Sequence, residues 1–198
     1  FTHCVDFVLA PIEPNMLYDN FFFSIMKTLI TIGPDVVKPE SSIELHEQLM
    51  LCASYALNTQ FSLDRPGCYS IHHIADQFTA KYGIDHGATL AMVMPKFLEK
   101  TFEERKEKYA LACQEIFHVT QGTVEEKARI FIERVKKFIK DIGIISKPSE
   151  WPGVTIQPGD IDEVQEMIVK NVNNGKPFGV NGIGTPEFVR EMLKETLI

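Results

Sequence analysis

The sequence lacks clustered basic residues and closely spaced cysteine pairs, and each absence excludes a class of protein. Its 198 residues carry a formal net charge of −7, and the richest basic stretch, Arg134 to Lys140, is interleaved with apolar residues. Phosphate binding needs clustered Lys and Arg, so we expect no nucleic-acid partner. The four cysteines stand at positions 4, 52, 68 and 113. None forms a C-x-x-C pair, which excludes a zinc knuckle and a thioredoxin-type motif and predicts reduced, buried thiols.

Long apolar runs are lacking as well. The most apolar segment, Met16 to Gly33, is interrupted by Asp19, Asn20 and Lys27, which makes it too polar for a membrane span and typical of a core helix. We therefore expect no membrane partner. The chain opens with Phe1 inside an apolar run and not with Met, so we interpret it as a fragment of a longer protein.

Strand signals are weak throughout, and the sequence predicts an all-α fold. Only 143–146 and 154–157 offer short candidates for a sheet, and the Pro, Gly and Ser of 143–159 indicate a loop. Helix starts are predicted by capping boxes and by a Thr-Pro pair: Ser41-x-x-Glu44, Thr101-x-x-Glu104, Thr123-x-x-Glu126, Asp160-x-x-Glu163 and Thr185-Pro186.

Two apolar stripes at helical spacing predict a helical hairpin. The first comprises Phe102, Tyr109, Ala110, Cys113, Ile116 and Phe117, and the second comprises Val124, Ala128, Phe131, Val135, Phe138 and Ile142. We expect Gly122 to close this hairpin and Gly143 to end its second helix. The Gly-rich segment 174–184 has neither a leading strand nor a following Lys-Ser/Thr, so we interpret it as a loop and not as a phosphate-binding motif.

The most informative segment is 68–95, CYSIHHIADQFTAKYGIDHGATLAMVMP, which holds three of the six histidines. On one continuous helix, His72 and His86 would lie roughly 21 Å apart. Gly83 supplies a break: a helix ending near Ala80 and an extended return over 82–85, about 13 Å long, would bring His86 beside His72. A second helix, 87–98, would follow. Two neutral imidazoles in a helical core need either hydrogen-bond partners or a divalent transition metal.

This segment resembles the second signature of the iron-containing alcohol dehydrogenases, which is H-x(13)-H followed by G-x-T-L-A-x-V-x-P. KYGIDH and TLAMVMP are most similar to its NADP-preferring butanol dehydrogenase and aldehyde reductase branch. The likeness is specific over Asp64 to Leu98 and weaker over 1–9 and 185–197. It implies a helical bundle of the dehydroquinate synthase-like kind. Residues 1–198 would form one metal- and substrate-binding domain, and the nucleotide-binding α/β domain would be absent from this chain.

The resemblance also implies the metal ligands. Carried over by position, they are His3, His72 and His86, with an aspartate four positions before His3 that would fall before Phe1. We expect the three histidines to converge on one divalent metal, iron or alternatively zinc. This chain has Asp76 where the family usually has a further histidine. Its carboxylate is a partner that fixes an imidazole tautomer, a replacement proton relay, or a solvated side chain. His73, pointing about 100° away from His72, is interpreted as structural or surface.

The implied activity is reversible hydride transfer between a small alcohol or aldehyde and NAD(P), which would be bound mainly by the missing N-terminal domain. The implied protein is a cytoplasmic homodimer, and the fragment alone is expected to be inactive. Two alternatives remain. Asp76 is the only support for a catalytically altered homologue or a non-catalytic helical assembly domain. A helical metal-dependent phosphohydrolase would need an adjacent His-Asp pair and more acidic ligands, which this sequence fits poorly.

Overall fold

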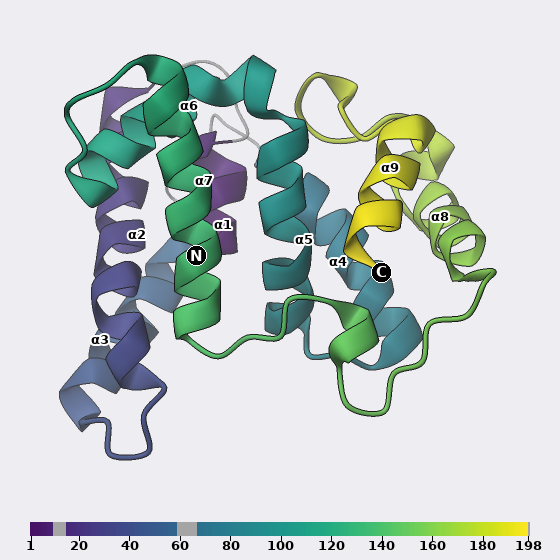
Figure 1. The fold of residues 1–198 in the computed structure, drawn as a ribbon, viewed down its shortest axis with the longest axis horizontal. Coiled ribbons are helices and arrows are strands. Elements are labelled where there is room, and N and C mark those ends of the chain that lie inside the picture. The colour runs from purple at the N-terminus through teal and green to yellow at the C-terminus, as the bar shows by residue number, and fades with distance from the viewer. Residues whose placement is uncertain (10–14, 59–66, 198) are drawn as a thin grey trace. The chain divides into compact units, whose positions relative to one another are not determined.

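The structure, a computed structural model, describes residues 1–9, 15–58 and 67–197, and it is helical as the sequence predicts (Figure 1). Within these residues the β-structure is limited to an isolated antiparallel bridge between Phe178 and Gly184. The start of the signature likeness, 64–66, lies outside the described residues. The chain divides into two compact units.

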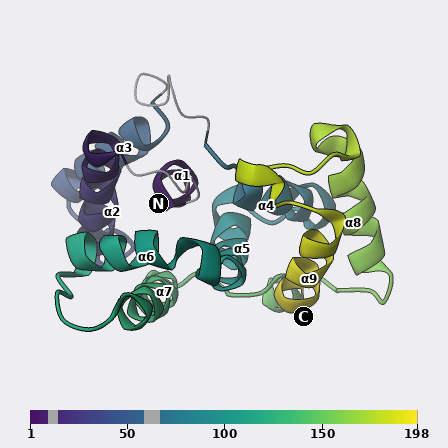
Figure 2. The same ribbon diagram turned by 90° about the horizontal axis from the view of Figure 1, so that it is seen from above.

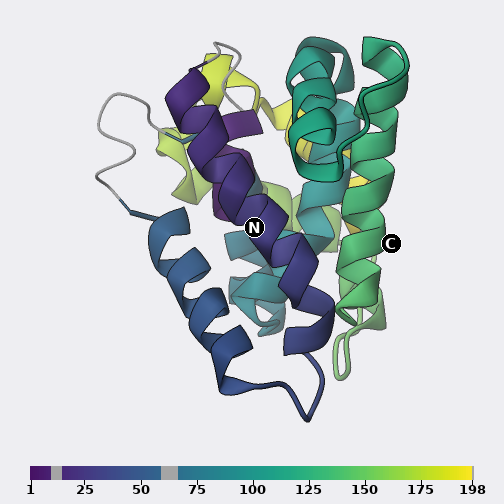
Figure 3. The same cartoon turned by 90° about the vertical axis from the view of Figure 1, so that its left-hand side faces the viewer.

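The first unit comprises Phe1–Gly67 and Phe102–Gly143. It opens with a short helix α1 that continues as a π-helical turn, followed by a pair of longer helices and, after the excursion into the second unit, by a helical hairpin. The bounds are α1 Thr2–Cys4, the π-helical turn Val5–Leu9, α2 Met16–Val36, α3 Ile43–Ala56, α6 Phe102–Phe117 and α7 Val124–Asp141. Figure 3 shows α2 and α3 as neighbours that run in opposite directions.

Helix α2 is the predicted core helix. Its N-terminus is capped by Asn15, whose side chain accepts a hydrogen bond from the backbone N–H of Tyr18. Phe22 and Met26 are fully buried on its inner face, and the Phe22 ring stacks on Phe7 of the π-helical turn, with ring centres 5.4 Å apart. The apolar character of this segment therefore serves packing within the unit.

The predicted hairpin of α6 and α7 is confirmed, and the two helices pack along each other. Gly122 adopts φ +101° in the connection, and Thr123 forms a complete capping box with Glu126. Tyr109 on α6 stacks on Phe131 of α7, with ring centres 5.8 Å apart. Val124 does not belong to the buried stripe of α7, since its side chain is 43% exposed and burial begins at Ala128 in the second turn.

A buried ion pair joins α2 to α6. Lys108 Nζ lies 3.0 and 2.9 Å from the two carboxylate oxygens of Asp19, and both side chains are almost inaccessible to solvent. Asp19 also accepts a hydrogen bond from the backbone N–H of Asn15 at the helix start. The lysine therefore satisfies a carboxylate that would be costly to bury alone.

The second unit comprises Cys68–Thr101 and Ile144–Ile198. Its helices are α4 Ser70–Tyr82, α5 His86–Lys100, α8 Asp160–Asn171 and α9 Pro186–Thr196, with short 3₁₀ turns at Pro148–Glu150, Asn173–Gly175 and Val180–Gly182. Helix α8 packs against both α4 and α9, and α9 also contacts α5, so the four helices enclose one core (Figure 2). The segments predicted as loops, 143–159 and 174–184, are irregular apart from these 3₁₀ turns and the isolated bridge.

The predicted capping box at Ser41 is wrong, and the Ser41 hydroxyl instead contacts His46 Nε2 at 2.6 Å. At α3 the N-cap is Ser42 and not Ser41: the Ser42 hydroxyl accepts the backbone N–H of Leu45. The Thr101 hydroxyl donates to the carbonyl of Phe97 at the end of α5, and the capping box expected at Thr101 stays a prediction.

The predicted box at Asp160 is also wrong. Asp160 is the first residue inside α8, its N-cap is Gly159, and its carboxylate accepts the backbone N–H of Gln157. The Thr-Pro signal is confirmed, since Thr185 caps α9 through the backbone N–H of Phe188. Among the described residues, no helix combines the length and apolar character that crossing a membrane would require.

Candidate metal centre

Helix α4 carries His72 in its first turn and holds it against the core of the second unit. Ile71, Ile74 and Phe78 are fully buried and fix the rotation of the helix, so that His72 is also turned inward, with 8% of its surface exposed. The helix ends at Gly83, whose φ of +67° is a left-handed conformation that glycine adopts without steric cost.

The connection from α4 to α5 differs in detail from the sequence prediction. Helix α4 continues to Tyr82, two residues beyond the predicted end near Ala80, and only Gly83, Ile84 and Asp85 separate it from α5. Of the predicted extended return over 82–85, the extended character is found at Asp85, with φ −54° and ψ 132°. The prediction underestimated how sharply a left-handed glycine redirects the chain.

The start of α5 is anchored by its own apolar cluster. Ile84, Ala88 and Met92 are buried together, and Trp151 and Val154 of the 143–159 loop pack against them. This packing explains why the loop containing the lone tryptophan is ordered against the helix pair. Helix α5 begins at His86, one residue before the predicted start at Gly87, so His86 lies in its first turn, as predicted.

His72 and His86 are brought together, as the Gly break predicts. The centres of their imidazole rings lie 5.6 Å apart, with an angle of 52° between the ring planes. With metal–nitrogen bonds of about 2.0–2.1 Å, each ring centre would lie roughly 3.2 Å from a bound ion, so ring centres about 5–6 Å apart are compatible with one shared ion. The two imidazoles therefore fit a divalent metal in both donor chemistry and spacing.

A carboxylate faces the same pair. Asp76 Oδ1 lies 3.4 Å from His86 Nδ1, and the side chains of Asp76 and His86 are 51% and 44% exposed. Sequence reasoning placed Asp76 on the face of His72 because the two residues are one helical turn apart. It did not identify His86 as the partner, since that contact depends on how α5 crosses α4.

A second contact fixes that crossing. The hydroxyls of Thr79 on α4 and Thr89 on α5 lie 3.1 Å apart, and Thr89 also donates to the carbonyl of His86. The first turn of α5 is thereby held against the last turn of α4.

His3 lies in the first unit, at the middle residue of the short helix α1, which continues at Val5 as the π-helical turn Val5–Leu9. Single π-helical turns are rare and are frequent at functional sites. Because His3 and the His72–His86 pair belong to different units, their convergence stays a prediction. Among the described residues, no group of three or more His, Cys, Asp or Glu side chains is assembled in metal-binding proximity.

His73 has a structural role, as expected for a residue rotated away from His72. Its ring packs edge-on against Phe178 of the Gly-rich loop, with ring centres 5.3 Å apart. The same loop places Gly179 over the start of α4, where a Cβ atom would lie 2.0 Å from Ser70 Oγ. Ser70 Oγ in turn contacts the Cys68 thiol at 3.0 Å. The loop therefore supports the helix that carries His72, and its glycine is required by close packing.

The C-terminal end of α4 is tied to α8 by a buried polar cluster. The Tyr82 hydroxyl donates to Asp160 Oδ2 at 3.0 Å, and Lys81 Nζ lies 3.0 Å from Asp160 Oδ1. Burial, together with the neighbouring Asp160 carboxylate, raises the pKa of Tyr82 above its ordinary value. Burial opposes ionisation of Asp160, but hydrogen bonds from the Gln157 backbone, Lys81 and Tyr82 outweigh it and lower the pKa of this carboxyl group.

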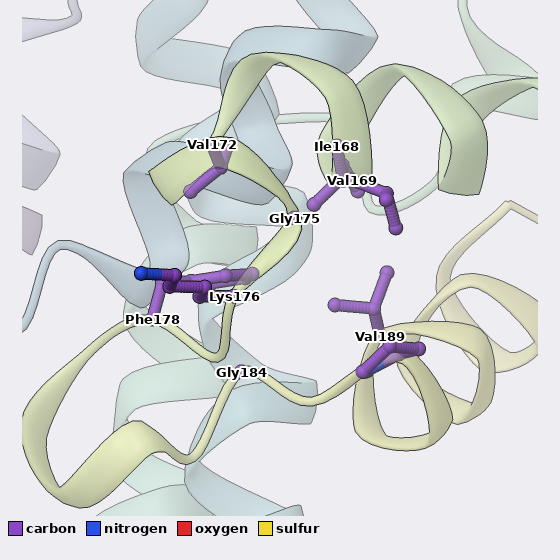
Figure 4. Close-up of a pocket in the computed structure, with 9 residues that line it drawn as sticks. Ile168, Val169, Val172, Gly175, Lys176, Phe178, Gly184 and Val189 are labelled. Atoms are coloured by element: carbon purple, nitrogen blue, oxygen red, sulfur yellow. The ribbon is translucent and has the colours of Figure 1, made fainter.

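A cavity of about 10 Å³ lies between α8, the Gly-rich loop and α9 (Figure 4). Ile168, Val172, Phe178 and Val189 line it, so it is apolar. It has the volume of a single water molecule and is too small for a substrate. All four cysteines are free and buried, as predicted, and burial raises the pKa of the Cys4 thiol, next to His3, to about 11.

A protein-family model matches most of the chain. The model of the Fe-containing alcohol dehydrogenase family, C-terminal, matches residues 1–176. The chain therefore belongs to this family and represents its C-terminal part, which confirms the resemblance seen in the signature segment.

Named relatives agree with this assignment. The NADPH-dependent aldehyde reductase YqhD of Escherichia coli (strain K12) is 26% identical over 152 residues, which cover 76% of this chain and 39% of the reductase. The probable NADH-dependent butanol dehydrogenase 1 of Bacillus subtilis (strain 168) is 24% identical over 181 residues, covering 90% of this chain and 45% of that protein. The chain thus spans less than half the length of these relatives.

Solved structures confirm the fold. The substrate- and cofactor-free form of the aldehyde reductase YqhD from E. coli superposes with a TM-score of 0.86 at 21% identity, covering 98% of this chain and 50% of that chain. The NADH-dependent butanol dehydrogenase A from Thermotoga maritima gives a TM-score of 0.84 at 22% identity, covering 100% of this chain and 50% of that chain.

Proposed function

We propose that this chain is the metal- and substrate-binding part of an NAD(P)-dependent alcohol dehydrogenase or aldehyde reductase, with His3, His72 and His86 as metal ligands. The observation that carries the proposal is the approach of the His72 and His86 rings to 5.6 Å across the Gly83 break, in a member of this family. The fourth ligand would be an aspartate four positions before His3, as the family pattern implies. Iron is the proposed metal, and zinc is the alternative.

The bound ion would act as a Lewis acid that stabilises negative charge on the substrate oxygen. The chain's own contribution is to hold the ligands in place before substrate arrives. His72 is fixed by the buried face of α4, and the backbone of His86 is held in place by the apolar cluster of Ile84, Ala88 and Met92. The exposed side of His86 leaves the pair open toward a substrate.

The nicotinamide cofactor would be bound mainly by a nucleotide-binding domain outside this chain, because the chain contains no dinucleotide-binding fingerprint. Small alcohols or aldehydes are the proposed substrates, in keeping with the names of the relatives. The family resemblance further supports a homodimer in the cytoplasm. It also favours the dehydrogenase over the phosphohydrolase alternative.

Metal content and activity of the full-length protein test this proposal. His72→Ala and His86→Ala should each lose most of the bound metal, measured by elemental analysis, and should lose NAD(P)-linked aldehyde reduction. His46→Ala is the matched control: His46 is an exposed histidine whose ring contacts Ser41, far along the chain from the signature. Undiminished metal content in both α4 and α5 variants would overturn the assignment of these ligands.

A metal-loaded wild-type protein without activity toward any alcohol or aldehyde would instead favour the catalytically altered homologue. A wild-type protein that binds no metal would favour the non-catalytic assembly domain. Metal stoichiometry therefore separates the proposed function from its alternatives.

A further inference from the structure

The contact between Asp76 and His86 joins two helices at the proposed metal site. Asp76 Oδ1 approaches the Nδ1 atom of the imidazole, at 3.4 Å, and this atom is only one of the two ring nitrogens that can bind a metal. The same helix presents His72 one turn earlier. One turn of α4 thus supplies a proposed ligand and a carboxylate directed at the second proposed ligand.

We propose that Asp76 is a positioning residue that holds the proton of neutral His86 on Nδ1 and leaves Nε2 as the metal-binding nitrogen. This inference rests on the proposed metal site and adds to it a residue outside the ligand set. Metal-binding histidines generally donate their second ring N–H to a carboxylate or a carbonyl group, which fixes the tautomer and the orientation of the ring.

The geometry favours this role over that of a solvated carboxylate. The first turn of α5 is held against α4 by the Thr79–Thr89 contact and by the buried cluster around Ile84, so the backbones that carry Asp76 and His86 are fixed relative to each other. A carboxylate that interacted only with solvent would have no reason to face the His86 ring. The half-exposed ring of His86 lacks the tight packing that orients His72, so an external partner is needed to orient it.

The tautomer of His86 tests the inference without reference to activity. In metal-free, full-length protein labelled with ¹⁵N-histidine, two-bond ¹H–¹⁵N correlation spectra distinguish Nδ1–H from Nε2–H in the neutral ring. The wild type should show the Nδ1–H form of His86. Asp76→Ala should shift the population to Nε2–H, whereas Asp76→Asn should retain Nδ1–H, because the amide oxygen still accepts the hydrogen bond.

Asp85→Asn is the matched control for charge. Asp85 is exposed and adjacent to His86 in the chain, and its side chain makes no capping hydrogen bond in α5. It should leave the tautomer unchanged. An Nε2–H form in the wild type, or an unchanged Nδ1–H form in Asp76→Ala, would overturn the inference.

Metal affinity provides the second readout. Competition titration of the full-length protein with Co²⁺ should show about 10- to 100-fold weaker binding for Asp76→Ala, as expected on losing a carboxylate partner of a ligating histidine. Asp76→Asn should lie between this variant and the wild type. If His86→Ala weakens binding but Asp76→Ala does not, the inference fails and the metal site stands. If His86→Ala binds Co²⁺ as tightly as the wild type, the proposed function itself fails.

Discussion

His72 and His86 are fourteen residues apart in the chain, yet their ring centres lie 5.6 Å apart across the junction of α4 and α5. The junction consists of only three residues, and Gly83 is the one in a left-handed conformation. The approach of the two proposed ligands therefore depends on a conformation that residues other than glycine adopt at a cost.

Gly83→Ala should destabilise the protein by about 1–2 kcal/mol. A Cβ atom at Gly83 would meet no other atom within 4 Å, so the expected cost comes from the φ of +67° alone. Gly87→Ala is the matched control, because Gly87 also has open space but lies inside α5, where alanine is the better helix former. Urea denaturation of both variants gives the comparison, and equal stabilities would contradict the assigned role of Gly83.

Gly179→Ala should be more destabilising than Gly143→Ala, although both glycines have φ +76°. Gly143 has open space, so its substitution should cost about 1–2 kcal/mol from the backbone alone. A Cβ atom at Gly179 would lie 2.0 Å from Ser70 Oγ, and displacing this side chain should add about 1–3 kcal/mol.

Thermal or urea denaturation of the two variants measures the difference directly. Indistinguishable free energies of unfolding would mean that the Gly-rich loop does not pack on α4 as described.

Lys108→Met should destabilise the first unit by about 3–5 kcal/mol, because it leaves the Asp19 carboxylate buried without its cation. The double variant Asp19→Leu/Lys108→Met removes both charges and should be more stable than the single variant. A double-mutant cycle by chemical denaturation measures this recovery. A double variant less stable than Lys108→Met would contradict the claim that the unpaired Asp19 carboxylate is what destabilises the single variant.

Asp160→Asn should destabilise the protein by about 1–3 kcal/mol at neutral pH, through weakened hydrogen bonds at a buried site. The pKa of Asp160 is lower in the folded protein than its ordinary value of 3.8. Its charge therefore contributes stability above about pH 3.8, and this contribution is lost as the pH falls through the lowered pKa.

The variant should accordingly show a smaller loss of stability on acidification than the wild type. Asp162→Asn, at an exposed position of the same helix, is the control and should keep the acid dependence of the wild type. Parallel pH series of thermal denaturation decide the question, and an unchanged acid dependence in Asp160→Asn would contradict the account.

The sequence predicted those features that depend on local chemistry. The capping box at Thr123 was correct because Thr123 and Glu126 hydrogen-bond each other within one turn. The predicted box at Asp160 was wrong because Tyr82 and Lys81, far away in the chain, bind its carboxylate.

At the candidate site, the spacing and Gly83 were enough to predict that His72 and His86 meet. The partner of Asp76 was not predictable from the spacing along one helix, since it depends on the crossing of α4 and α5 that Thr79 and Thr89 set. Local patterns thus identified the helices and the histidine pair, and tertiary contacts determined what surrounds them.

The most direct test of the metal site is anomalous X-ray diffraction from crystals of the full-length protein loaded with Fe²⁺, measured on both sides of the iron absorption edge. The account predicts one strong anomalous peak about 2.0–2.2 Å from a ring nitrogen of each of His3, His72 and His86. A peak remote from the His72–His86 pair, or fully loaded crystals in which His3 lies away from the ion, would contradict the proposed ligand set.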